Sequence, residues 1–87
     1  MHVLLMTYET MAATAYILIT CDSGDEDHII RALSQTSGIT KCSVLDGPYN
    51  MIIKMDADDM DKLDEVVAGK LKQIDKISSM LTLKQIE

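Results

Sequence analysis

The sequence predicts an α+β fold in which a strand–helix–strand unit occurs twice, as in ferredoxin-like βαββαβ sandwiches. Short apolar runs occupy residues 15–20, 41–45, 51–55 and 79–83. An acidic segment and a helical pattern follow the first and the third run, and a Gly-Pro turn separates the second run from the third. With 87 residues, the chain is long enough for one domain with one thin core.

Both predicted helices begin in acidic segments, which suit the positive end of the helix dipole. We expect the first to start near Ser23, whose hydroxyl would cap it, with Glu26 completing a capping box. We expect the second to run from near Asp58 to Ile74, because its apolar residues follow helical spacing. Gly69 interrupts that apolar stripe, which suggests close packing against the sheet or a neighbouring subunit.

The first strand predicts a sheet that is apolar on both faces, because Tyr16 and Leu18 alternate with Ile17 and Ile19. Gly38 should stop the first helix before the second strand begins. Helices cover only one face of such a sheet, so the other face needs another cover. A second copy of the chain is the economical one, and we therefore predict a homodimer with sheets packed face to face.

Charge and hydropathy exclude several classes of protein. The net charge of −6 and the scattered lysines and arginines argue against direct nucleic-acid binding. No apolar run approaches the roughly 20 residues of a membrane span. The apolar run at 3–6 is too short for a signal peptide, is followed by Glu9 and has no preceding Lys or Arg. We interpret residues 1–14 as an N-terminal extension and 15–87 as the domain.

The two cysteines favour a reducing compartment. Cys21 ends the first predicted strand and Cys42 begins the second, and the third strand lies between them in this topology. We expect the two at the same end of the sheet, about 10 Å apart, which is too far for a disulfide. Free thiols predict a cytoplasmic protein.

Catalytic and metal-binding motifs are not recognisable. The acidic segment 56–61 lacks the central Gly and the terminal Glu of an EF-hand loop and leads straight into a helical pattern, so it is better explained as a helix start than as a calcium loop. We interpret the segment 22–27 in the same way. His2 and His28 have no metal-ligand spacing to each other or to the cysteines. We expect His28 to be a surface residue, and we predict no enzyme activity and no cofactor.

The turn at residues 46–50 is richer than a hairpin requires, because Tyr49 and Asn50 follow Gly47 and Pro48. Two interpretations stay open at this point: a turn whose tyrosine packs on its neighbours, or a binding loop.

Over residues 15–87 the sequence resembles the effector-binding (RAM) domain of the Lrp/AsnC family of feast/famine transcriptional regulators. Four short features carry the resemblance, in an order and spacing typical of the family. They are Ala15-Tyr16-Ile17-Leu18-Ile19, Gly38-Ile39, Gly47-x-Tyr49-Asn50 and Leu81-Thr82-Leu83.

The resemblance implies dimers with sheets packed face to face, higher-order rings, and an amino acid or similar small metabolite bound in clefts between subunits. It assigns ligand binding to the turn and to the last strand. Asn50 stands where the family usually has Asp, and Met80 where it usually has a first Thr, so a charge and a hydroxyl are missing. The implied ligand-binding residues are Gly47, Tyr49, Asn50, Met80 and Thr82.

The resemblance therefore predicts a stand-alone regulatory domain without the family's DNA-reading head, acting on a partner such as a full-length Lrp/AsnC regulator. Two other functions stay open. One is a ligand-free assembly module, suggested by Asn50 and Met80. The other is a small dimeric α+β-barrel enzyme, which would need a catalytic histidine or a deep cleft with convergent polar groups.

Overall fold

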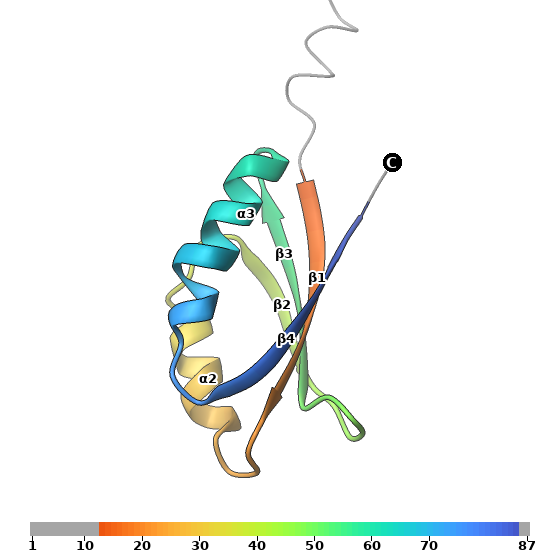
Figure 1. Cartoon of the computed structure of the whole chain (residues 1–87), viewed down its shortest axis with the longest axis vertical. Coiled ribbons are helices and arrows are strands. Elements are labelled where there is room, and N and C mark those ends of the chain that lie inside the picture. Colours follow the sequence, from red (N-terminus) through yellow and green to blue (C-terminus); the bar gives the residue numbers. More distant parts are fainter. Residues whose placement is uncertain (1–12, 86–87) are drawn as a thin grey trace, which may run out of the picture.

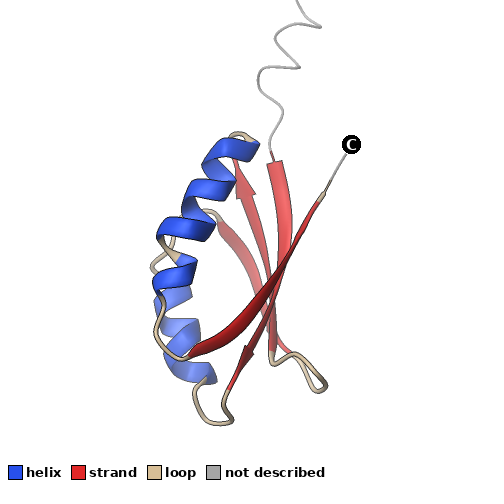
Figure 2. Ribbon diagram, in the orientation of Figure 1, coloured by secondary structure: helices blue, strands red, loops and turns tan. Residues whose placement is uncertain are grey.

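The computed structural model describes residues 13–85 and confirms the predicted α+β fold. Two helices cover one face of a four-stranded antiparallel sheet, and within residues 13–85 no helix covers the opposite face (Figures 1 and 2). The elements are β1 (Ala13–Cys21), α2 (Glu26–Leu33), β2 (Ile39–Val44), β3 (Met51–Ala57), α3 (Met60–Gly69), the 3-10 turn η1 (Leu71–Gln73) and β4 (Ile77–Lys84).

The strand order β2-β3-β1-β4 places β1 and β3 in the centre and makes β2 and β4 the edge strands. Ile17 of β1 pairs with Ile53 of β3 on one side and with Thr82 of β4 on the other. Residues that pair in this way share a face of the sheet, so the register decides which side chains meet the helices. Each end of the sheet combines distant parts of the chain. In Figure 1 the β2–β3 turn lies at the lower end, and the start of β1 lies beside the end of β4 at the upper end.

The core lies between the sheet and the two helices. Alternate residues of β1 and β3 point into it, and aliphatic side chains of α2, α3 and η1 complete it, each contributing about 1.5–3 kcal/mol by burial. The other parity of both strands points to the helix-free face, as the alternation of apolar residues predicts. The buried residues are Ala13, Ala15, Ile17, Ile19, Ile29, Leu33, Met51, Ile53, Met55, Leu63, Val67 and Leu71.

The helix starts differ from the predicted ones. The Ser23 cap is wrong, because β1 and a turn extend to Asp25 and α2 begins only at Glu26. Oε1 of Glu26 accepts a hydrogen bond from the Gly24 N–H at 2.9 Å instead. For α3 the acidic segment does cap the helix. Oδ1 of Asp59 accepts from the Lys62 N–H at 2.8 Å, one residue later than predicted.

The second helix is also shorter than predicted. α3 ends at Gly69, and the chain continues through η1 to Ile74, which is extended. A Cβ added at Gly69 would meet no atom within 4 Å, so packing within the chain does not explain this glycine. Gly69 instead coincides with the end of the helix, and η1 then places Leu71 in the core.

Gly38 does not stop the first helix, which ends five residues earlier at Leu33 and is capped by Ser34. Its role lies in the turn that leads into β2. Its φ is +95°, and a Cβ there would come within 2.7 Å of the Asp56 carbonyl oxygen. The Asp56 N–H donates to the Gly38 oxygen at 2.8 Å. The glycine therefore allows the two backbones to approach closely.

Both cysteines are free thiols, but their predicted placement at the same end of the sheet is wrong. Cys42 pairs with Ile53 and so lies level with Ile17, in the middle of the sheet, whereas Cys21 lies four residues further along β1. The separation is therefore larger than predicted, and a disulfide is still excluded.

No helix within residues 13–85 combines the length and the apolar character that a membrane crossing requires. Most of the predicted extension, including His2, lies outside the described residues, and Ala13 and Thr14 are already part of β1.

Candidate functional site

The β2–β3 turn is tied to the end of β1 by Asn50. The Asn50 N–H donates to the Ile19 carbonyl at 2.8 Å, and the Leu45 N–H donates to the Asn50 carbonyl at 2.8 Å. The side chain adds a third bond, because Asn50 Oδ1 accepts from the Cys21 N–H at 2.8 Å. The two amide protons of Asn50 and the second lone pair of its Oδ1 therefore remain available to a ligand. Tyr49 is half-buried beside it, and Gly47 is exposed.

Met80 and Thr82 lie on β4 and face the helix side of the sheet. Their orientation follows from the register, since Met80 pairs with Ile19 and Thr82 with Ile17, both of which are core residues. Because β4 is an edge strand, these side chains line an open groove of about 370 Å³ against α3. The complete lining is Asp64, Val67, Ala68, Lys72, Met80, Thr82 and Lys84.

The five predicted ligand-binding residues thus form two groups rather than one site. Gly47, Tyr49 and Asn50 share the turn beyond β3, and Met80 and Thr82 lie on the far side of β1. Two strand spacings, about 10 Å, separate the groups across the sheet. A pocket that used both groups at close range would combine the turn of one protomer with the groove of another.

The helix-free face of the sheet carries an exposed apolar patch, which we call the outer patch. Three of its side chains are markedly exposed: Tyr16 at 37%, Leu81 at 43% and Leu83 at 49%. Polar pairs border it at both ends. Thr14 donates to Asp56 at 2.7 Å, and the Thr20 and Ser79 hydroxyls bond to each other. The outer patch consists of Tyr16, Leu18, Ile52, Leu81 and Leu83.

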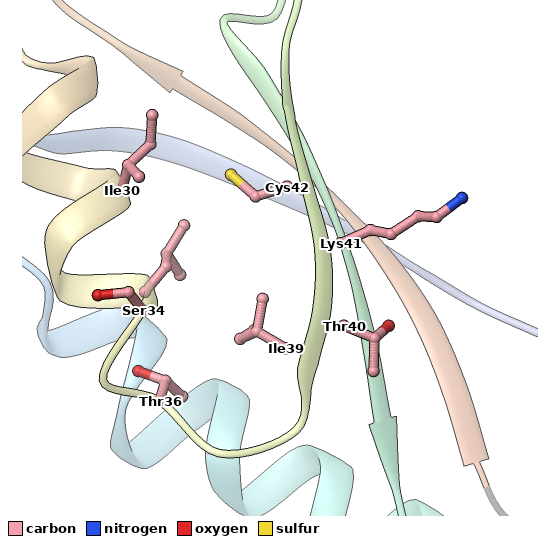
Figure 3. A pocket seen from close by; sticks show the side chains of 8 residues that line it. Ile30, Ser34, Thr36, Ile39, Thr40, Lys41 and Cys42 are labelled. Carbon is pink, nitrogen blue, oxygen red and sulfur yellow. The ribbon is translucent and has the colours of Figure 1, made fainter.

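A second groove, of about 200 Å³, lies between α2 and β2 and was not predicted from the sequence (Figure 3). Ile30, Ile39 and the Cys42 thiol point into it, whereas Lys41 points away to the other side of the sheet. The nearby hydroxyls are used locally, since Ser34 donates to the Arg31 carbonyl and Thr36 to the Ala32 carbonyl. The alternation in β2 is too short and too polar to indicate this groove in advance.

The titrating groups do not form a catalytic constellation. Burial raises the pKa of the Cys42 thiol. Burial is also the main cause of the raised pKa of Cys21, and the carboxylates of Glu26, Asp25 and Asp22 add to it. His28 is exposed on α2. Within residues 13–85 no three His, Cys, Asp or Glu side chains cluster in a way that could hold a metal ion.

Comparison with known families identifies the domain that carries this sheet, turn and groove. The family model described as the Lrp/AsnC ligand binding domain matches residues 14–87. The chain belongs to the Lrp/AsnC ligand-binding domain family. The family is regulatory, and its fold is the one described above. No curated protein sequence matches this Lrp/AsnC domain.

Solved structures agree with this assignment. FFRP-DM1 superposes on the Lrp/AsnC domain with a TM-score of 0.80 at 26% identity, over 85% of this chain and 99% of that chain. E. coli AsnC gives a TM-score of 0.80 at 25% identity, over 95% of this chain but only 54% of its own length. The regulator NMB0573 from Neisseria meningitidis, solved as a complex with L-Met, shares the fold alone at 11% identity, with a TM-score of 0.79 over 94% of this chain and 54% of that one.

Proposed function

We propose that this Lrp/AsnC domain dimerises through its outer patch, binds an amino acid or related small metabolite between subunits, and transmits the bound state to a partner transcriptional regulator. A full-length Lrp/AsnC regulator is the partner we favour, because about half of E. coli AsnC has the same fold as this domain. The role is regulatory rather than enzymatic. The free thiols favour a reducing compartment, and we place the protein in the cytoplasm.

The exposure of the outer patch is the observation that carries the proposal. Leu81 and Leu83 lie side by side with Tyr16 and Leu18 on a sheet face that no helix covers. Contiguous apolar surface of this kind marks an interface, and a two-fold dimer covers the same patch on both subunits at once. The α3–β4 groove lies on the helix side of the sheet, outside this interface, so a site shared there would need contacts between dimers, as in the rings that the family resemblance implies.

The proposed ligand site combines the two groups of residues described above. Tyr49 would shape the pocket, while the Gly47 backbone and the Asn50 amide protons would bond the ligand's polar end. Thr82 would add a hydroxyl and Met80 an apolar wall. A ligand that touches two subunits binds the assembled form more tightly than separate protomers, and this difference couples binding to assembly.

The dimer is tested by native mass spectrometry at low micromolar concentration. We expect an even multiple of the 9.7 kDa chain. Leu81→Glu would place an unpaired carboxylate in both halves of the interface, and we expect it to weaken the dimer by more than about 100-fold, since burying such a charge costs several kcal/mol. Val44→Glu is the matched control, because Val44 is 60% exposed on the opposite face of the sheet. A monomeric wild type would refute the proposal.

Ligand binding is tested by thermal shift with a panel of amino acids and their metabolites. A ligand at 100 times its Kd stabilises the folded state by about 2.7 kcal/mol, which raises the Tm of a domain of this size by several degrees. Tyr49→Ala should abolish the response, and Asp46→Ala in the same turn should not. A dimer that responds to nothing in the panel would favour a ligand-free assembly module instead.

One observation does favour that second candidate. Asn50 carries no negative charge and Met80 offers no hydroxyl, so the implied pocket lacks two groups that the family pattern supplies. A pulldown between tagged and untagged subunits, followed by mass analysis for a retained small molecule, separates the two functions.

A further inference from the structure

The α3–β4 groove contains a lysine without a counter-charge. Two ion pairs occur in residues 13–85: Lys62 with Glu65 at 3.7 Å, and Lys84 with Asp64 at 2.7 Å. Lys72 is therefore more than 4 Å from every carboxylate in the described part of the chain. Asp64 is the one carboxylate that lines the groove, and Lys84 already occupies it.

The groove is locally cationic in an acidic protein. It carries two lysines and one aspartate, a net charge of +1, whereas the whole chain carries −6. Screening limits the reach of the distant acidic residues to about 8 Å at physiological salt, so the nearest charges decide what binds here. An anionic group on a ligand would balance Lys72.

The surfaces beside Lys72 are apolar. Val67 and Ala68 of α3 and Met80 of β4 line the groove together with the lysine. A second hollow of about 330 Å³ shares Lys72 and Met80 and adds Ile74 and Ile77. A molecule with one anionic end and an aliphatic body fits this arrangement, and the Thr82 hydroxyl can donate to a second ligand oxygen.

The same residues offer little to a ligand ammonium group. Asp64, the one carboxylate of the groove, is paired with Lys84. The charge that remains beside the apolar lining is the Lys72 ammonium, which repels a second ammonium group. An amino acid would therefore lose water around its ammonium without gaining a charged partner.

We infer that the α3–β4 groove binds an aliphatic monocarboxylate through Lys72, and that it prefers a branched 2-oxo acid to the amino acid of the same skeleton. The inference rests on the proposed function and narrows it, since Met80 and Thr82 belong to both sites. It adds Lys72 as the residue that determines specificity.

Calorimetry with 4-methyl-2-oxopentanoate and with L-leucine tests this inference on the wild-type chain, Lys72→Gln and Lys70→Gln. Lys70 is the matched control, because it is exposed and is not part of either lining. We expect the oxo acid to bind at least tenfold more tightly than leucine, Lys72→Gln to weaken that binding at least tenfold, and Lys70→Gln to leave it within twofold. Unliganded Tm values show whether each variant is folded.

The outcomes separate this inference from the proposed function. Tighter binding of leucine, or an unchanged affinity in folded Lys72→Gln, overturns the inference and leaves a ligand-binding domain. No binding of either compound, with no response across the amino-acid panel, overturns both.

Discussion

Asn50 Oδ1 and the Cys21 N–H are joined by a 2.8 Å hydrogen bond that connects the β2–β3 turn to the end of β1. The bond spans 29 residues of sequence and joins the turn to the point where the register of β1 and β4 shifts. Asn50 is thus a structural residue before any ligand arrives. An aspartate at this position would also accept a hydrogen bond from the Cys21 N–H. Having Asn50 where the family usually has Asp therefore removes a charge but keeps this bond.

The first prediction concerns this bond. Asn50→Leu should lower the free energy of unfolding by about 1–2 kcal/mol, because it leaves the partly buried Cys21 N–H without its acceptor. Asn50→Asp should stay within about 0.5 kcal/mol of the wild type at pH 7, because a carboxylate oxygen replaces the amide oxygen. Urea denaturation measures both values. Asp46→Ala, an exposed change in the same turn, is the control. Equal losses in Asn50→Leu and Asp46→Ala would contradict the structural role.

The second prediction compares three glycines. Gly38→Ala should destabilise the fold by about 2–4 kcal/mol, since it combines a positive φ with a Cβ that would lie 2.7 Å from the Asp56 oxygen. Gly24→Ala should cost about 1–2 kcal/mol, because its φ is +99° but its surroundings are open. Gly69→Ala should stabilise by about 0.5–1 kcal/mol, as the site is helical and unobstructed.

Thermal and urea unfolding of the three variants measure this order directly. The difference between Gly38→Ala and Gly24→Ala measures the cost of steric contact, because both glycines have a positive φ but only Gly38 has a backbone atom close to the added Cβ. A Gly38→Ala protein as stable as Gly24→Ala would mean that the approach to Asp56 relaxes without cost.

The fold was predictable from the sequence because the apolar pattern of each segment and the order of the segments favour the same architecture. Alternation of apolar residues in β1 correctly predicted which of its side chains enter the core and which face the opposite side of the sheet, and the acidic segment before α3 supplied a cap at Asp59. The helix limits were not predictable at the same level. Ser23 has the right chemistry for a cap, but the competing turn closed by Asp25 N–H and Asp22 C=O delays α2 to Glu26.

The candidate site was predictable only as a set of residues, through family resemblance. Which residues lie together depends on the register of β4 against β1, and no local pattern specifies that register. The role inferred for Lys72 was not predictable from the sequence for a related reason. From the sequence, a lysine just after a helix is explained by its favourable interaction with the helix dipole. Only the structure shows that Asp64, the carboxylate of the same groove, pairs with Lys84 and leaves Lys72 without a counter-charge.

The third prediction concerns Lys76, which has a φ of +80° in the turn before β4. A non-glycine residue pays about 1–2 kcal/mol for this conformation, and glycine does not, although glycine also gains about 0.5–1 kcal/mol of entropy in the unfolded chain. Lys76→Gly should therefore raise the free energy of unfolding by up to about 1 kcal/mol. Lys70→Gly, at a φ of −117°, should lower it by about 0.5–1 kcal/mol. Urea melts of both variants test the contrast, and a loss of stability in Lys76→Gly would show that its side chain matters more than its backbone.

The fourth prediction uses the two thiols, whose pKa values are raised for different reasons. Burial alone acts on Cys42, whereas burial and the carboxylates of Glu26, Asp25 and Asp22 act on Cys21. Salt at 1 M shortens the screening length to about 3 Å and so removes much of the carboxylate effect. In Cys42→Ser, where Cys21 is the remaining thiol, alkylation by iodoacetamide at pH 8 should accelerate about two- to threefold between low and high salt. In Cys21→Ser the rate should not change.

The sign of the pH dependence follows from the same shifts. A thiol whose pKa is higher in the folded state than in the unfolded state keeps its proton to a higher pH when the protein is folded. Its contribution to stability is complete below the unfolded pKa and disappears as the pH rises through the folded value. The free energy of unfolding should therefore fall above the ordinary thiol pKa, by less in the Cys21→Ser, Cys42→Ser double variant than in the wild type. Urea melts between pH 7 and pH 10 measure the difference, and parallel curves for the two proteins would show that the thiols are not the groups responsible.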